Sequence, residues 1–287
     1  MGLWPADYEE YVLKDIEKYK DTRKIKKAGF IERCAVKTLN PHQMHPNPDD
    51  EFSQESVGPN FQIISKYMSQ VKKFDPSYYV IYDDPIFVQK MDPDGYLILN
   101  GHHRWFAALR LGFKKLRVQI VNLVNDEDVN RMLQATTNTR IASFDLDEIL
   151  LTDNPDDQAR IIDDIFSRKI TIRLRKGVPE LFNALHEAGY DIWIYSADYN
   201  SEEYISTFFS MYCLTVDGII NGVTEKRRTN SSERAHFKEL MAGKYTNSLH
   251  IDDLSVVSVD NANKDFQQYD IEGSDWAQGV IDIIKKL

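Results

Sequence analysis

Three apolar segments in the second half of the sequence each end in acidic or hydroxyl side chains. "IASFDLD" ends in Asp145 and Asp147, "YDIWIYS" ends in Ser196, and "NSLHIDD" ends in Asp252 and Asp253. An amphipathic helical pattern, "VPELFNALHEAG", separates the first segment from the second. Alternating strands and helices predict a parallel sheet, and the carboxyl ends of parallel strands lie along one edge, where α/β proteins bind ligands. We therefore expect an α/β unit with these polar side chains gathered at one edge of its sheet.

The spacing of Asp145 and Asp147 suits phosphoryl transfer. Two carboxylates at a strand end can share a divalent cation, while one attacks phosphorus and the other handles the proton of the leaving group. An isolated pair of this kind more often caps a helix and faces a solvated turn. The serine and the second aspartate pair at the other strand ends favour the functional interpretation here.

Taken together, these segments resemble the haloacid dehalogenase superfamily of phosphotransferases across about residues 140–287. The resemblance implies a Rossmann-like parallel sheet, with little or no cap because the stretch between Asp147 and Ser196 is short. It also implies that Asp145 is the nucleophile that forms an aspartyl-phosphate, that Asp147 is the acid/base, and that Ser196 bonds the phosphoryl group. Asp252 and Asp253 would complete a Mg²⁺ site with Asp145 and the carbonyl of Asp147.

The same resemblance calls for a lysine that neutralises the nucleophile and the phosphate. Two candidates precede the second aspartate pair, Lys226 and Lys238. We favour Lys226 and keep Lys238 as the alternative.

A second candidate site lies in the first half, in "ILNGHHRWFAALRLG". A strand ending at Asn100 and Gly101 runs into a helix, whose first N–H groups lie at the positive end of the helix dipole, and glycine lets an anion approach closely. Arg104 offers a planar fork for phosphate oxygens, and His102 and His103 can donate hydrogen bonds or a proton. The plainer alternative is that His103 caps and packs while Arg104 forms a surface ion pair.

"LNGHHRWFAALRLGFKKLRVQIV", preceded by "HPNPDDEFS" and "DDPIFVQKMDPDGY", resembles the ParB/sulfiredoxin superfamily over about residues 30–125. The resemblance implies an α+β domain that binds nucleotide phosphates through residues 100–104. The Gly-His-His-Arg form looks most like the free-serine-kinase branch, in which an acidic residue acts as base, here Glu51 or Glu55. His102 stands where sulfiredoxins have cysteine, which argues against sulfinic-acid repair, and the absence of an evident helix-turn-helix module argues against chromosome partition.

Length and local patterns predict two domains, residues 1–137 and 138–287. In the first half, "FQIISKYMSQV" and "RWFAALRLG" indicate helices, and "DPIFVQKM", "GYLILN" and "LRVQIVNLV" indicate strands. The polar stretch "NDEDVNRMLQATTNTR" indicates a helix that connects the two domains.

Charge and composition argue against several classes of partner and ligand. The net charge of −10 comes from residues after 137, where 26 acidic residues face 16 basic ones, so we do not expect nucleic acid as a partner. No apolar run approaches the length of a membrane span and the N-terminus lacks a leader pattern, so we expect a cytoplasmic protein without a membrane partner. Cys34 and Cys213 are too few for a disulfide framework or a cysteine zinc site.

The first functional hypothesis is a Mg²⁺-dependent phosphomonoester hydrolase fused to a small-molecule kinase, ATP- or ADP-dependent, or to a nucleotide hydrolase. The alternative is a regulatory protein whose first domain senses a nucleotide (ATP, ADP or CTP) and gates the phosphatase or a partner. A second alternative, a nucleic-acid end-processing protein or nuclease, rests on fold analogy and a local basic cluster. The expected ligands are therefore Mg²⁺, a nucleotide and a small phosphoester, and the sequence specifies no oligomeric state.

Overall fold

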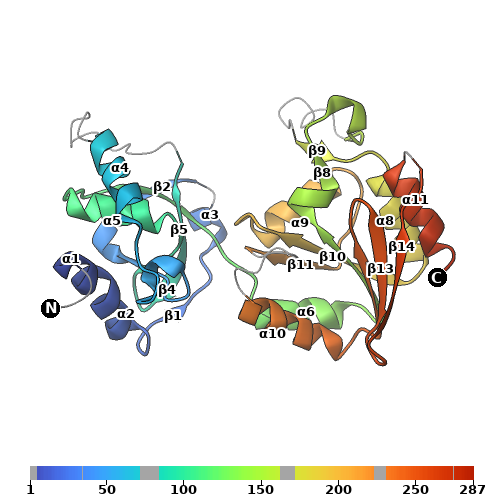
Figure 1. Ribbon diagram of the computed structural model, residues 1–287, viewed down its shortest axis with the longest axis horizontal. Helices are drawn as coiled ribbons and strands as arrows, with labels where there is room; N and C mark the ends of the chain where they lie inside the picture. The colour runs from blue at the N-terminus through green and yellow to red at the C-terminus, as the bar shows by residue number, and fades with distance from the viewer. Residues whose placement is uncertain (1–4, 34, 72–83, 162–171, 223–230, 274) are drawn as a thin grey trace. The chain divides into compact units, whose positions relative to one another are not determined.

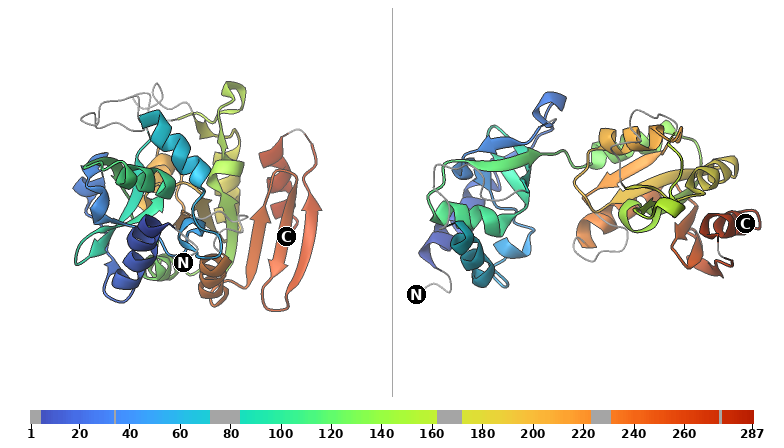
Figure 2. Two further views of the ribbon diagram at one scale, coloured as in Figure 1. Left: turned by 60° about the vertical axis from the view of Figure 1, so that its left-hand side comes forward. Right: turned by 90° about the horizontal axis from the view of Figure 1, so that it is seen from above.

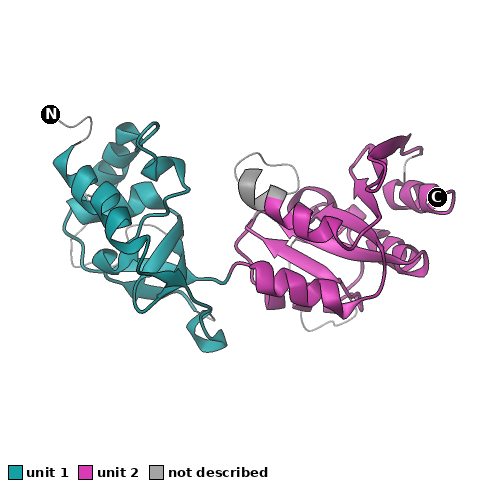
Figure 3. Cartoon of the chain, turned by 90° about the horizontal axis from the view of Figure 1, so that it is seen from below, with its two compact units in different colours: residues 1–122 teal, residues 123–287 magenta. Residues whose placement is uncertain are grey.

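The computed structural model describes residues 5–33, 35–71, 84–161, 172–222, 231–273 and 275–287, and it divides into two units, residues 1–122 and 123–287 (Figure 3). The division falls earlier than the boundary after residue 137 that the sequence suggested. Its cause is α6 (Asp126–Ala135), whose apolar side chains Val129, Met132 and Leu133 pack with Trp193 of the second unit. The connecting helix therefore belongs to the core of the second unit.

The first unit is a mixed sheet with helices. Its sheet runs in the order β2–β6–β4–β5–β3, and β1 pairs with β4. The strands are β1 (Lys24–Ile25), β2 (Lys37–Leu39), β3 (Met44–His45), β4 (Ile86–Asp92), β5 (Tyr96–Asn100) and β6 (Leu116–Ile120). The helical elements are α1 (Ala6–Tyr8), η1 (Glu9–Leu13), α2 (Lys14–Tyr19), α3 (Phe30–Arg33), η2 (Pro41–Gln43), η3 (Glu51–Ser53), α4 (Phe61–Val71) and α5 (His102–Arg110).

The core of the first unit forms where α5 covers the sheet. Trp105 and Phe106 of α5 are buried against Val88 of β4, Ile98 of β5 and Val118 of β6. In β6 buried and half-buried residues alternate, as expected of a strand with one face on the core. The helices α4 and α5 pack against each other (Figure 1). This packing fixes the strand-to-helix turn at Gly101.

The second unit is built on a sheet with the strand order β11–β10–β7–β12–β13–β14. Its strands are β7 (Arg140–Asp145), β10 (Tyr190–Ser196), β11 (Gly218–Asn221), β12 (Asn247–Ile251), β13 (Ser255–Asp260) and β14 (Asp265–Asp270). The first four are parallel, and β13 and β14 form an antiparallel hairpin at the edge (Figure 2). Because β10 and β12 flank β7 on opposite sides, the strand order reverses at β7, where open α/β sheets bind ligands.

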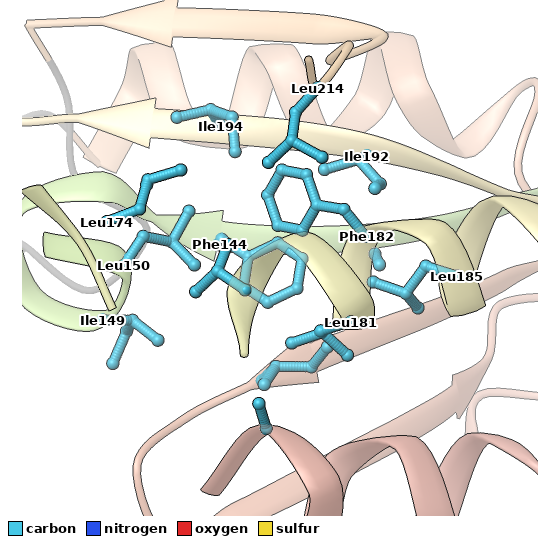
Figure 4. Packing of buried hydrophobic residues seen from close by; sticks show 14 of the residues in the cluster. Phe144, Ile149, Leu150, Leu174, Leu181, Phe182, Leu185, Ile192, Ile194 and Leu214 are labelled. Atoms are coloured by element: carbon cyan, nitrogen blue, oxygen red, sulfur yellow. The ribbon is translucent and has the colours of Figure 1, made fainter. Parts of the chain in front are cut away.

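Helices cover both faces of this sheet. On one face α8 (Val178–Glu187), α9 (Glu202–Ser210) and α11 (Trp276–Ile284) bury Phe144, Ile192 and Ile194 (Figure 4). On the other face α6 and α10 (Ser231–Ala242) lie side by side and bury Trp193 (Figure 1). Strand residues that alternate between the faces thus reach two separate cores, which explains the continuous apolar runs of β7 and β10.

The segment between β7 and α8 contains η4 (Leu146–Leu150), β8 (Leu151–Thr152), η5 (Pro155–Asp157) and β9 (Arg173–Leu174). Its described residues form a two-stranded antiparallel sheet, β8–β9, and two short helical turns. A transmembrane span would need a longer and more apolar helix than any found among the described residues.

Candidate functional site

Asp145 is the last residue of β7 and is buried, with 1% of its surface exposed. Asp145 is the N-terminal cap of η4, and its Oδ1 accepts a hydrogen bond of 3.3 Å from the backbone N–H of Glu148. Its Oδ2 has no hydrogen-bond partner within the described part of the chain. Burial raises the pKa of Asp145 to about 6, and the negative charges of Glu148 and Asp147 add to the rise.

Asp147 and Ser196 lie together beside Asp145. Ser196 ends β10, which pairs with β7 so that Tyr195 faces Asp145 across the ladder. The Ser196 hydroxyl donates to Oδ2 of Asp147 at 3.1 Å, and the Ala197 N–H donates to the same oxygen at 2.9 Å. The structure thus brings together the first three residues that the sequence assigned to catalysis.

The second aspartate pair follows β12 on the other side of β7. The last paired residues of the β7–β12 ladder are Ser143 and His250. Asp145 and Asp252 each come two residues later, so they occupy corresponding positions at the carboxyl ends of adjacent strands. Asp253 forms an ion pair with a basic side chain. Its Oδ1 accepts a hydrogen bond of 2.7 Å from Nη1 of Arg175.

Arg175 is a site residue that the sequence reasoning missed. Its guanidinium also donates to the carbonyl of Ile149 in η4 and stacks 4.6 Å from the ring centroid of Trp276. The indole N–H of Trp276 in turn donates to the carbonyl of Asp252 at 2.9 Å. A basic run, "RLRKG", just before the helix start of α8 was the available signal.

The fit of these residues to Mg²⁺ can be tested on the geometry. Among the described residues, no three His, Cys, Asp or Glu side chains come close enough together to hold a metal ion by themselves. Oδ2 of Asp145 has no hydrogen-bond partner among the described residues, and Asp252 follows the neighbouring strand at the matching position. These two carboxylates fit a hard cation, which takes oxygen ligands. Asp253 is bound to Arg175. Besides Asp145 and Asp252, the ligands of such an ion would be carbonyl oxygens, water and substrate.

The structure does not describe the side chains of the two candidate lysines. Lys226 lies outside the described residues. Lys238 lies on α10, but its side chain lies outside the described residues.

In the first unit, Gly101 forms the turn between β5 and α5. It adopts φ +98°, which favours glycine, and as the N-cap residue of α5 it has no side chain with which to cap the helix. A Cβ at this position would lie 3.0 Å from Cγ1 of Ile86 and 3.1 Å from Nη2 of Arg104. The first N–H groups of α5 therefore start at a turn that admits no side chain at Gly101.

Both histidines of the motif are neutral and bonded to backbone. Nε2 of His102 accepts from the N–H of Asn47 at 3.0 Å, so its proton is on Nδ1, which lies 3.4 Å from a carboxylate oxygen of Asp50. Burial lowers the pKa of His102 to about 4. Nε2 of His103 accepts from the N–H of Asn60 at 3.0 Å, and burial lowers the pKa of His103 as well.

Arg104 binds backbone carbonyl groups through its side chain. Its guanidinium donates to the carbonyls of Asp84 at 2.8 Å and Pro85 at 3.4 Å, ahead of β4. Glu51 and Glu55, the two candidate bases, are both exposed.

Two further residues of this site were not expected from the sequence. Asp50 caps η3 through its bond from the N–H of Phe52, and its Oδ2 lies 3.4 Å from Nδ1 of His102. Ser53 is buried, and its hydroxyl has no hydrogen-bond partner among the described residues. Phe52, between them, stacks on His102 with ring centroids 5.5 Å apart.

Residues 22–137 match the ParB N-terminal domain family, so this part of the chain is a ParB-like N-terminal domain. Among solved structures, a similar chain is the C-terminally truncated chromosome-partitioning protein ParB from Caulobacter crescentus complexed with CTP-gamma-S, at 21% identity and a TM-score of 0.25. The similarity covers 32% of this chain and 47% of that chain, so this protein spans less than half the length of that relative. No curated protein is similar enough to be matched. The expectation that nucleic acid is not a partner gains no support from the match to a ParB family.

Proposed function

We propose that the second unit is a Mg²⁺-dependent phosphomonoester hydrolase of the haloacid dehalogenase type, with Asp145 as nucleophile. The observation that carries the proposal is the buried Oδ2 of Asp145, which has no hydrogen-bond partner among the described residues. A buried carboxylate oxygen without a partner is costly, and a cation or a phosphorus centre would relieve that cost. Its position at the strand-order reversal of an α/β sheet adds to the proposal.

In the proposed reaction, a carboxylate oxygen of Asp145 attacks phosphorus and the bond to the leaving oxygen breaks. The leaving oxygen takes a proton from Asp147, which yields an alcohol and an aspartyl-phosphate. Water then attacks phosphorus, gives its proton to Asp147, and releases inorganic phosphate and the free Asp145 carboxylate. When bound by Asp145 and Asp252, Mg²⁺ would supply positive charge that offsets the repulsion between carboxylate and phosphate.

Two contacts prepare Asp147 for this role. The Ser196 hydroxyl and the Ala197 N–H both bind Oδ2, which fixes the carboxylate and leaves Oδ1 for the proton. The Ser196 hydroxyl donates its one hydrogen bond to Asp147 and so orients the acid/base. To bond a phosphoryl oxygen it would turn this hydrogen toward the phosphate. Lys226 or Lys238 would supply the remaining positive charge.

For the first unit we propose nucleotide binding at the turn between β5 and α5, through the N–H groups that follow Gly101. The uncapped first turn of α5 and the glycine at φ +98° support this. Ser53 follows Phe52, whose ring stacks on His102, and its buried hydroxyl offers a further hydrogen bond.

The hydrogen bonds of His102, His103 and Arg104 favour a domain that senses a nucleotide over one that acts as a kinase. His102, His103 and Arg104 use their bonds to hold backbone groups of neighbouring segments. Turnover would therefore depend on Glu51 or Glu55, which are exposed. A nucleic-acid partner is a third candidate on the ParB family match alone.

The deciding experiment screens the purified protein against phosphorylated metabolites and nucleotides with Mg²⁺, measuring phosphate release. The Asp145→Asn variant is the matched control, because it keeps the size of the side chain but is a far poorer nucleophile. Release that disappears in this variant supports the phosphatase, and equal release in both proteins contradicts it. Calorimetry with ATP, ADP and CTP tests the first unit separately.

A further inference from the structure

Asn221 ends β11 and lies directly beside Ser196, because the β10–β11 ladder pairs these two residues. It is buried, with 2% of its surface exposed. Its amide makes hydrogen bonds in opposite roles at its two ends. Oδ1 accepts from the N–H of Val124 at 2.8 Å, and Nδ2 donates to the carbonyl of Asn200 at 2.6 Å.

The first of these bonds reaches the junction between the two units. Asn122, the last residue of the first unit, exchanges hydrogen bonds with the backbone of Ala28 at 2.9 and 3.1 Å. Val124, two residues later, is held by Asn221. Leu123 fits against Gly222, where a Cβ would lie 3.0 Å from Cδ2 of Leu123.

The second bond reaches the loop that holds the acid/base. Residues 197–200 connect β10 to α9, and the N–H of Ala197 at the start of this loop donates to Asp147. At the end of the loop the carbonyl of Asn200 accepts from Asn221, and the carbonyl of Asp198 accepts from the N–H of Gly222 at 3.2 Å. Asn221 and Gly222, at the end of β11, therefore hold this loop by hydrogen bonds, and its first residue, Ala197, orients Asp147.

We infer that Asn221 is a positioning residue that joins the junction between the units to the loop that orients Asp147. This inference rests on the proposed phosphatase reaction. An amide suits the position because it accepts and donates at once, which neither a carboxylate nor an aliphatic side chain does. Since Asn221 is buried, losing either bond leaves a backbone group without its partner and loosens the segment that the bond holds.

The test uses the full chain and the variant Asn221→Asp, which keeps the acceptor for Val124 and loses the donor to Asn200. Asn261→Asp is the matched control. The Asn261 amide likewise donates to a backbone carbonyl, that of Tyr245, at 2.9 Å. This bond lies near the amino end of β12, away from the carboxyl ends of the strands where the candidate site lies. The two readouts are hydrogen exchange of the Ala197 amide and hydrolysis of p-nitrophenyl phosphate with Mg²⁺.

In Asn221→Asp we expect exchange of the Ala197 amide to rise about tenfold and kcat to fall about tenfold with KM little changed, since one hydrogen bond of ordinary strength is lost. Asn261→Asp should change neither quantity. Unchanged exchange at Ala197 in Asn221→Asp, or an equal rise in the control, overturns the inference.

Two further results keep the inference separate from the proposed function. The Val124 amide of the unaltered protein should exchange slowly, and unprotected exchange there overturns the inference even if the variant fails to fold. If the unaltered protein hydrolyses no phosphomonoester, the proposed function fails, while the exchange at Ala197 still decides whether Asn221 holds the loop. Hydrolysis that persists at full kcat in a folded Asn221→Asp protein overturns the inference alone.

Discussion

Arg175 and Asp253 form an ion pair with 2.7 Å between Nη1 and Oδ1 at the edge of the sheet where β7 and β12 end. The guanidinium also bonds the carbonyl of Ile149 and stacks on Trp276, so it holds the loops after β7 and β12 together. Of the two adjacent aspartates, Asp253 therefore has an arginine partner that ties it to the loop after β7.

The first prediction separates these two aspartates. Asp252→Asn should weaken Mg²⁺ binding at least about tenfold, because it removes one of two carboxylates that can face the ion. Asp253→Asn should change Mg²⁺ affinity by less than about threefold, because the lost charge is already paired. Calorimetric titration with MgCl₂ measures both, and a larger loss in Asp253→Asn than in Asp252→Asn would contradict the assignment.

The second prediction concerns the pH dependence that Asp145 imposes. Its pKa is about 6 in the folded protein against 3.8 as the ordinary value, so the folded state binds the proton more tightly. Stability contributed by this group therefore rises as the pH falls from about 7 toward 4, by up to about 3 kcal/mol. Asp145→Asn cannot titrate and should lack this gain.

Urea unfolding without divalent metal, at pH 7.5 and pH 4.5, measures the effect. The free energy of unfolding of the unaltered protein, relative to that of Asp145→Asn, should improve at the lower pH. Parallel behaviour of the two proteins would show that the Asp145 carboxylate is not held in a costly environment. Adding Mg²⁺ at pH 7.5 should stabilise the unaltered protein and have little effect on the variant.

The third prediction has the opposite sign and concerns the first unit. Burial lowers the pKa of His102 from 6.5 to about 4, so the unfolded chain binds the proton more tightly than the folded one. The stability that neutral His102 provides is complete above pH 6.5 and is lost as the pH falls toward 4, by up to about 3 kcal/mol.

Hydrogen exchange of the β6 amides, which lie in the core of the first unit, reports this loss. Protection should fall between pH 6.5 and 4 more steeply in the unaltered protein than in His102→Gln, after correction for intrinsic exchange. His236→Gln serves as control, because this histidine lies on the surface of the second unit. The same slope in all three proteins would mean that His102 does not resist protonation.

How far the sequence predicted the fold depended on periodicity. The helix expected over "FQIISKYMSQV" is α4, Phe61–Val71, and the strand expected at "GYLILN" is β5, because amphipathic and alternating patterns are local properties. The boundary expected after residue 137 coincides with the end of the family match, whereas the compact units divide after residue 122. A polar helix with a few apolar residues does not reveal which core receives them, and α6 gives Val129 and Met132 to the second unit.

The contacts of the candidate site could also be predicted only in part. Strand ends predicted that Asp145, Asp147 and Ser196 would meet, because parallel strands share an edge. The pairing of Asp253 with Arg175 could not be predicted, since the two residues are far apart in the sequence and either could have faced solvent. Likewise, the bonds of His102 and His103 to backbone N–H groups depend on loops whose course no local pattern encodes.

The last prediction uses two glycines at opposite ends of α5. Gly101 and Gly112 both have positive φ, +98° and +71°, so alanine strains the backbone at either position by about 1 kcal/mol. They differ in surroundings. A Cβ at Gly101 would press on Ile86 and on the Arg104 guanidinium, whereas a Cβ at Gly112 would meet nothing within 4 Å.

Gly101→Ala should therefore cost about 1–3 kcal/mol more stability than Gly112→Ala, as expected of overpacking. If a nucleotide phosphate binds the N–H groups that start α5, Gly101→Ala should also weaken CTP or ATP binding at least about tenfold, since a methyl group that presses on Ile86 and Arg104 would displace the start of the helix. Gly112→Ala should bind as the unaltered protein does, because it lies at the far end of the helix. Chemical denaturation and calorimetry measure the two effects, and equal nucleotide affinity in both folded variants would place the nucleotide away from this turn.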